Sequence, residues 1–388
     1  MKLKFLYIVF VITSCSTPSE KATEEEESSF LVKTKYSIEY NAGFNSYSNQ
    51  IFEEDGREYA AFADFTTRKE IKLFDAHSAS LVGSIPLDSI INQGQLISGY
   101  TMVNVDSVLV LTEYTNQLYL LNRSGEIIKK VDFNVYLNAD TAFMLTTCHP
   151  FMTKDKVLYF GVLFPYNENI AMGHIDDVYD QLRIEKQTPY LVEVEGVFSD
   201  SIRIRYGLRN FYSRFMGDEE TSLERRQVKI LNDKIFVHSI FCDTIYEVNP
   251  NTLEIDKMYT IKSNFSSFGY KSVTFDETSK GWHNELGQTK GRIDHILYDD
   301  DNELYYVLCY LERPLDAPRE RNIRPWSYIV YDKNFNKLQE VKMDENVYSA
   351  VSPLVIKEGI LISNYPQHKN DKDIFTKSTY ELFKPVKN

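Results

Sequence analysis

A repeated hairpin pattern is the feature of this sequence that most restricts the fold. An apolar stretch, a short acidic or Asn/Gly turn and a second, strongly apolar stretch recur six times along the chain. The six copies begin at Ile51, Met102, Phe151, Val228, His295 and Pro353. Their turns carry Asp or Glu beside Gly, Lys, Ser or Asn, which is typical of tight β-hairpins. Repetition of one such unit predicts a propeller or a related repeat architecture.

A second hairpin follows each of the first five copies. Examples are QLYLLNRSGEIIKKVDF from Gln117 and DTIYEVNPNTLEIDKMYTI from Asp243, each with a polar turn between two strand-like runs. Two hairpins give four antiparallel strands, and six such repeats predict an all-β fold, a six-bladed β-propeller. The composition agrees, because 27 Tyr and 24 Phe favour strands and no long amphipathic helical pattern is present.

The N-terminal end of the repeat region has one extra strand, and the C-terminal end is one strand short. The sixth copy supplies three strands, in PLVIKEG, ILISNY and STYELFKP, whereas Phe30–Tyr40 is a strand without a hairpin partner. Pairing this N-terminal strand with the last blade would close the ring and cover a sheet edge. We therefore predict a propeller domain over 30–388 whose last blade is completed by residues 30–40.

The first fifteen residues, MKLKFLYIVFVITSC, have the layout of an export signal. Lys2 and Lys4 precede an apolar run, Phe5–Ile12, that is too short to span a bilayer. The run ends in Ile-Thr-Ser-Cys, which resembles the lipobox of bacterial lipoproteins. The resemblance implies that residues 1–14 are a signal peptide and that Cys15 is acylated, giving a membrane anchor. The alternative is an ordinary signal peptide followed by a chance cysteine.

Residues 15–29 form an acidic segment rich in Ser, Thr and Glu, including Glu24–Glu27. Such a composition cannot bury a core, so we predict a flexible tether. Acidic residues after a lipidated cysteine also resemble the signal that sends Bacteroidota lipoproteins to the cell surface. The protein is therefore expected in the cell envelope, as an outer-membrane lipoprotein that faces either the periplasm or the exterior.

The propeller pattern and the lipobox together resemble the TolB-like six-bladed β-propeller lipoproteins of Bacteroidota. The resemblance covers roughly residues 30–388 and rests on the strand pattern, without a catalytic motif. It implies a fold and a cellular location. It does not imply a reaction, since one fold serves many functions and many of these lipoproteins have no known one.

Five long segments interrupt the hairpins of blades 3 to 6. They are Phe164–Gln187, Tyr206–Arg226, Ser263–Gly291, Leu311–Pro325 and Tyr365–Lys377. If the strands of a blade are lettered A to D outwards from the channel, the A–B and C–D turns lie on one rim of the ring. The register places all five segments at B–C or D–A connections, on the other rim. Long connections on a rigid scaffold are where binding residues gather.

These segments and their edges combine Arg with aromatic residues. The candidate binding residues are Arg209, Tyr212, Arg214, Trp282, His283, Arg321, Arg324 and Trp326. Arg beside aromatic rings suits carbonyl, carboxylate or sugar groups, and Trp and Arg dominate protein interfaces. The alternative is that the aromatic side chains pack the segments onto the rim while Arg neutralises nearby acids.

The sequence gives weaker support to other chemistry. The formal net charge of −13 argues against nucleic-acid binding, and no cofactor motif is present. The seven His residues are isolated in the sequence, so no metal site is predicted. Asp299–Asn302 lacks the spacing of a calcium loop and is expected to be a solvated turn. Cys148, Cys242 and Cys309 are expected to be buried free thiols.

The leading interpretation is a lipid-anchored, non-enzymatic propeller that binds a protein partner or a glycan through the rim of blades 3 to 6. One alternative is a channel-centred lyase or hydrolase that uses His149 or His295 with nearby carboxylates. Another is a periplasm-facing envelope scaffold. An enzyme would need polar groups with shifted pKa values that converge in a pocket.

Overall fold

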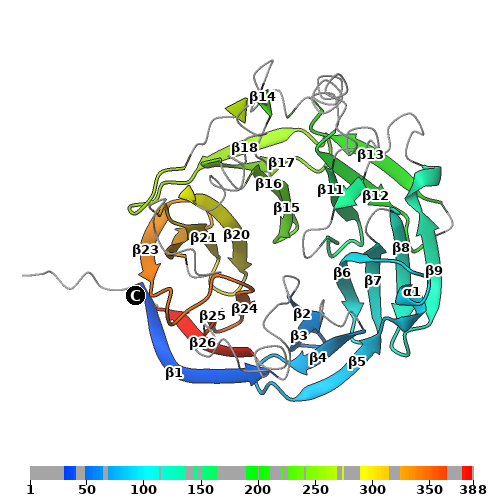
Figure 1. Cartoon of the computed structure of the whole chain (residues 1–388), viewed down its shortest axis with the longest axis horizontal. Helices are drawn as coiled ribbons and strands as arrows, with labels where there is room; N and C mark the ends of the chain where they lie inside the picture. The colour runs from blue at the N-terminus through cyan, green and yellow to red at the C-terminus, as the bar shows by residue number, and fades with distance from the viewer. Residues whose placement is uncertain are drawn as a thin grey trace, which may run out of the picture.

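Six four-stranded antiparallel sheets form a ring in the computed structural model (Figure 1). The structure describes residues 30–40, 49–63, 69–112, 115–136, 144–146, 151–163, 189–199, 201–209, 211, 220–221, 226–239, 242–268, 273–274, 289–313, 324–364 and 378–386. The predicted fold, an all-β six-bladed β-propeller, is confirmed. The predicted signal peptide, Cys15 and the acidic tether lie outside the described residues.

The blades follow one another along the chain, and the strands of each blade are ordered from the channel outwards. Blade 1 contains β2 (Gln50–Glu54), β3 (Arg57–Ala63), β4 (Glu70–Asp75) and β5 (Leu81–Pro86). Blade 2 contains β6 (Ile97–Asn104), β7 (Ser107–Thr112), β8 (Gln117–Asn122) and β9 (Ile127–Asp132). Blade 3 contains β10 (Met144–Thr146), β11 (Leu158–Leu163), β12 (Leu191–Glu195) and β13 (Arg203–Gly207). Blade 4 contains β15 (Arg226–Leu231), β16 (Lys234–Ser239), β17 (Thr244–Val248) and β18 (Ile255–Thr260).

The last two blades complete the ring. Blade 5 contains β20 (Arg292–Asp299), β21 (Leu304–Tyr310), β22 (Trp326–Asp332) and β23 (Lys337–Met343). Blade 6 contains β24 (Leu354–Ile356), β25 (Gly359–Ser363), β26 (Ser378–Pro385) and β1 (Leu31–Tyr40). A separate two-stranded sheet pairs β14 (Glu220–Thr221) with β19 (Val273–Thr274). The helices assigned in the described residues are α1 (Asp88–Ile91) and the 3-10 helix Phe133–Val135, and no described helix is long and apolar enough to cross a membrane.

The N-terminal strand closes the ring, as predicted. β1 pairs with β26 from Leu31 opposite Pro385 to Tyr40 opposite Ser378, so it is the outermost strand of blade 6. Tyr40 then reaches blade 1, where its fully buried ring lies 4.8 Å from that of Phe62 and its hydroxyl donates to the Ala76 carbonyl at 2.6 Å. One strand therefore joins the first blade to the last.

The innermost strand of blade 3 differs from the expectation. The hairpin pattern places this strand at Phe151, whereas β10 lies at Met144–Thr146 and Met152 makes only an isolated bridge to Leu158. The pairing with β11 is thus divided into two short stretches. The other five inner strands pair as their hairpin turns predict.

Polar turn residues fold back onto the backbone at the outer hairpins. In blade 2, the Asn122 side chain accepts hydrogen bonds from the backbone N–H groups of Ser124 and Glu126, and Gly125 adopts a φ of +79°. A Cβ at Gly125 would lie 2.5 Å from the Pro86 carbonyl oxygen of blade 1. Glycine is therefore required both by the backbone conformation and by the close approach of two blades.

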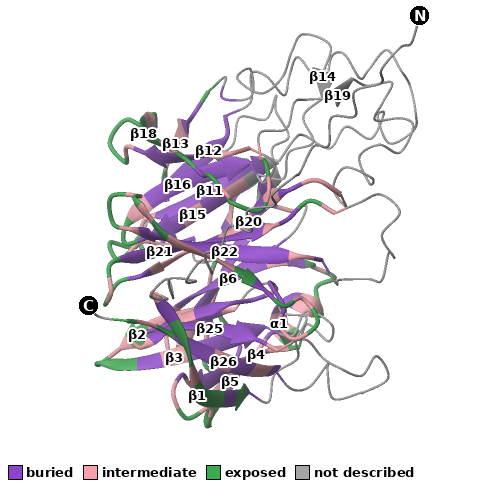
Figure 2. Cartoon of the chain, turned by 90° about the vertical axis from the view of Figure 1, so that its left-hand side faces the viewer, coloured by how far each residue is buried: buried purple, intermediate pink, exposed green. Residues whose placement is uncertain are grey.

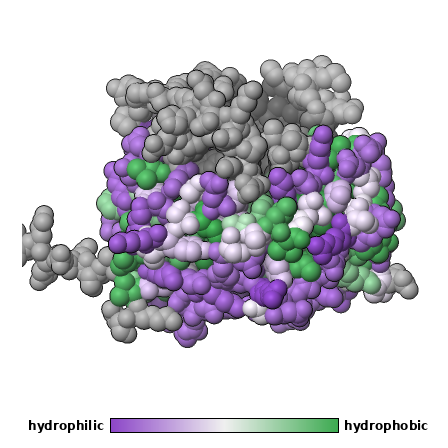
Figure 3. All heavy atoms as spheres, turned by 90° about the horizontal axis from the view of Figure 1, so that it is seen from below, coloured by the Kyte–Doolittle hydropathy of each residue, from purple (hydrophilic) through white to green (hydrophobic). Residues whose placement is uncertain are grey.

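The hydrophobic core lies between successive blades. One cluster joins Leu109 and Leu118 of blade 2 to Phe160 and Val192 of blade 3. A side view shows that buried residues run through the blades, while exposed residues gather at the turns and along the outer strand β1 (Figure 2). The flank of the ring that is seen from below carries a mixture of hydrophilic and hydrophobic residues (Figure 3).

Candidate functional site

The long segments leave the propeller from a single rim. Residues 164–187, 311–325 and 365–377 connect second to third strands, and 206–226 and 263–291 connect outer strands to the next inner strand. In antiparallel blades all these strand ends lie on the same side of the ring, which we call the loop rim. The short A–B and C–D turns form the opposite side, the turn rim. The register on which the site prediction depends is therefore correct.

Most candidate binding residues lie outside the described residues. These are Tyr212, Arg214, Trp282, His283 and Arg321, in three of the long segments. Arg209 is described, directly beyond the end of β13 on the loop rim. It is exposed, and its guanidinium lies 5.9 Å from the centre of the Tyr206 ring. Of the eight candidates, Arg209 is the one that the structure places on the rim surface.

Trp326 and Arg324 belong to the core, which corrects their assignment to a binding surface. Trp326 is 1% exposed, and its Nε1 donates to the Tyr348 carbonyl at 3.2 Å. Arg324 is 8% exposed and donates to the carbonyls of Leu311 and Lys290. Burial lowers the pKa of Arg324 to about 10. Both side chains hold the start of β22 in place, and the packing alternative anticipated this for Trp326.

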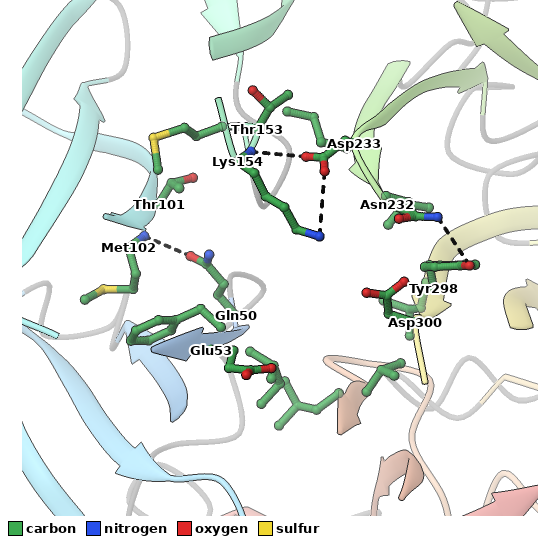
Figure 4. Close-up of a pocket in the computed structure, with 18 of the residues that line it drawn as sticks. Gln50, Glu53, Thr101, Met102, Thr153, Lys154, Asn232, Asp233, Tyr298 and Asp300 are labelled. Carbon is green, nitrogen blue, oxygen red and sulfur yellow. Dashed lines mark hydrogen bonds and ion pairs between the residues drawn. The ribbon is translucent and has the colours of Figure 1, made fainter. Parts of the chain in front are cut away.

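A cavity of about 550 Å³ opens in the centre of the ring on the turn rim (Figure 4). It is lined by the ends of the inner strands and by the turns that follow them. Gln50, Thr101, Lys154, Asn232 and Asp300 are among its polar residues. Its apolar lining includes Met102, Ile230, Ile296 and Leu354.

Side chains around this cavity link neighbouring blades. The links join Met102 N to Gln50 Oε1 (2.9 Å), Phe151 N to Thr101 Oγ1 (3.1 Å), Lys154 N to Asp233 Oδ1 (3.1 Å), Asn232 Nδ2 to Tyr298 Oη (3.3 Å) and Lys357 Nζ to Glu53 Oε2 (3.1 Å). Five of the six blade junctions are bridged in this way by described residues. The polar lining of the cavity therefore has a structural role in holding the ring together.

A second polar group lies on β20, beyond the cavity and nearer the loop rim. Pairing with β21 shifts between Ile293 and His295, so Asp294 occupies a β-bulge. A bulge redirects side chains, and here the Asp294 carboxylate lies 3.3 Å from both His295 Nε2 and Arg292. Burial lowers the pKa of His295 to about 4, so this imidazole is neutral at pH 7. His149, the other channel candidate, lies outside the described residues.

Two further expectations are refined by the structure. Asp299 is 1% exposed and accepts hydrogen bonds from Asn302 and from the Tyr306 hydroxyl, whereas Asp300 and Asp301 are exposed, as expected of a solvated turn. Cys309 is a buried free thiol whose pKa is raised by burial. Cys242 is only half-buried, and Cys148 lies outside the described residues.

Sequence comparisons find no match for this chain among protein-family models or curated proteins. Among solved structures, it is similar to a DUF4221-family member from Bacteroides vulgatus, with 17% identity and a TM-score of 0.71 over 92% of this chain and 98% of that one. It is also similar to a candidate exported protein from Bacteroides fragilis, with 11% identity and a TM-score of 0.54 over 94% and 98% of the two chains. At these identities the likeness shows the fold alone.

Proposed function

We propose that this protein is an exported, lipid-anchored propeller of the bacterial cell envelope that binds a protein partner or a glycan at its loop rim. The observation that carries the proposal is the asymmetry of the ring. Five long connections leave from the loop rim, whereas the turn rim has short hairpins that its own side chains tie together. Long connections on a rigid scaffold are a usual arrangement in binding proteins.

The lipid anchor is supported by the sequence Ile-Thr-Ser-Cys at residues 12–15. Changing Cys15 to Ser should abolish labelling with a palmitate analogue and should release the protein from membranes. Retention of the Cys15→Ser variant in the membrane pellet after a high-salt wash would show that the anchor lies elsewhere.

The binding surface can be tested with a matched pair of arginines. Arg209 is exposed on the loop rim, and Arg57 is exposed on the turn rim, at the start of β3. We expect Arg209→Ala to weaken capture of an envelope protein or of an arrayed glycan, and Arg57→Ala to leave it unchanged. Equal effects of the two substitutions would mean that the loop rim is not the binding surface.

A channel-centred hydrolase or lyase is the second candidate, because the Asp294 carboxylate contacts a neutral His295 at the channel. A carboxylate beside a neutral imidazole can orient it as a general base. Any hydrolytic or eliminating activity of the purified protein should then fall at least about 100-fold in His295→Gln. An activity that survives this substitution would show that Asp294 and His295 do not catalyse it.

A further inference from the structure

The junction between the first and last blades brings three metal-ligating side chains together on the turn rim. Glu58 is the second residue of β3, His77 lies in the outer hairpin turn of blade 1, and Glu358 lies in the inner turn of blade 6. One ligand atom from each lies within 4.8 Å of the others. Blades 1 and 6 are neighbours in the ring (Figure 1), but Glu358 is far from the other two along the chain. The group therefore exists only once the ring has closed.

The two sides of the His77 ring have different geometry. Nε2 lies 2.9 Å from Glu58 Oε2, which is an ordinary hydrogen-bond distance. Glu58 is itself fixed, because it is 8% exposed and accepts from the Lys357 backbone N–H at 3.1 Å. A carboxylate held in this way orients an imidazole and assigns the proton to Nε2. Nδ1, on the opposite side, then presents its lone pair.

Nδ1 faces Glu358 Oε2 at 3.3 Å. Solvent does not reach that oxygen, and no described residue donates a hydrogen bond to it. Two ligand atoms that each lie about 2.1 Å from a tetrahedral metal are separated by about 3.4 Å. The spacing of Nδ1 and Oε2 is therefore that of two neighbouring ligands of one ion.

The charges point to a cation at the same place. Glu58 and Glu358 bring two negative charges to one imidazole, which has a single proton when neutral. The ammonium of the neighbouring Lys357 is paired with Glu53 at 3.1 Å. A divalent ion between His77 and Glu358 would supply the missing positive charge.

We propose that His77 and Glu358 bind a divalent transition-metal ion of the zinc type, with Glu58 as the carboxylate that positions the imidazole. Imidazole nitrogen and carboxylate oxygen are ligands that Zn²⁺ accepts, and a carboxylate on the second ring nitrogen is the usual support for a metal-bound histidine. Because the two ligands come from different blades, the ion would link the first blade to the last and stabilise the closed ring. This site is independent of the loop-rim binding function.

The test is titration of the full chain in detergent with Zn²⁺, without a polyhistidine tag, followed by calorimetry and by thermal melting. We expect one saturable site and a melting temperature that rises with Zn²⁺ and falls back with EDTA. Glu358→Gln, which alters a half-exposed turn residue, should abolish both effects. Glu58→Gln should weaken binding by about 10- to 100-fold, because it removes only the positioning group.

Glu303→Gln is the matched control, since Glu303 occupies the inner turn of blade 5 and pairs with Lys333. It should bind Zn²⁺ like the unmodified chain. Unchanged binding in both Glu358→Gln and His77→Gln would place the ion elsewhere and overturn the proposal. Absence of saturable Zn²⁺ binding would also overturn it, and the three residues would then be an ion-paired contact between blades.

Discussion

Tyr40 is predicted to be the residue on which closure of the ring most depends. Its side chain is fully buried between the two ends of the ring, with ring centres 4.8, 5.5 and 5.7 Å from those of Phe62, Phe74 and Tyr380. Truncation of a buried aromatic side chain costs about 3–5 kcal/mol. The cost of Tyr40→Ala should lie at the upper end of this range, because the substitution also leaves the buried Ala76 carbonyl without its donor.

Tyr40→Phe separates the hydrogen bond from the packing. It keeps the ring and removes only the 2.6 Å bond to the Ala76 carbonyl, so we expect a loss of about 1–3 kcal/mol. Val32→Ala is the control, because Val32 lies on the same strand but is 46% exposed, and it should cost less than about 0.5 kcal/mol. Urea unfolding followed by circular dichroism gives the three free energies. A Tyr40→Ala variant as stable as Val32→Ala would refute closure by β1.

Three other perturbations test the interior. Trp326→Ala should cost about 3–5 kcal/mol in the same urea experiment, and a cost below about 1 kcal/mol would contradict its burial. Gln50→Ala should cost about 1–3 kcal/mol, because it leaves the buried Met102 N–H without an acceptor, and an unchanged unfolding midpoint would contradict that link. Burial, reinforced by Lys229, lowers the pKa of His238 from 6.5 to about 3. Its contribution to stability is therefore present above pH 6.5 and lost as the pH falls towards 3. His238→Gln should reduce the slope of unfolding free energy against pH, between about pH 6 and 4, by up to about 1.4 kcal/mol per unit. An unchanged slope would mean that His238 is not buried in its neutral form.

The fold could be predicted because its signals are local. A turn such as Asn122–Glu126 carries its own hydrogen-bond chemistry, and alternating apolar runs on either side set the strands. Closure by Phe30–Tyr40 followed from counting strands, since an unpaired edge is unfavourable. The divided inner strand of blade 3 was missed because a pairing shift within one hairpin leaves the hydrophobic pattern almost unchanged.

The candidate site was harder to predict because side-chain direction depends on tertiary packing. Trp326 is next to a long segment in the sequence, yet it is the first residue of β22 and faces the core between blades 5 and 6. The group of Glu58, His77 and Glu358 left no spacing signal, because its members come from opposite ends of the chain. The bulge at Asp294 shows only in how β20 pairs with β21, and this pairing cannot be derived from the sequence of one strand.

Site-specific photo-crosslinking in intact cells tests the central claim most directly. A photoreactive amino acid would replace Arg209 on the loop rim and, in a second strain, Arg57 on the turn rim, with Cys15 and its anchor kept in both. We expect a discrete adduct, to a protein or to a glycan, from position 209 and none from position 57. An adduct from position 57 alone, or equal adducts from both positions, would contradict binding at the loop rim.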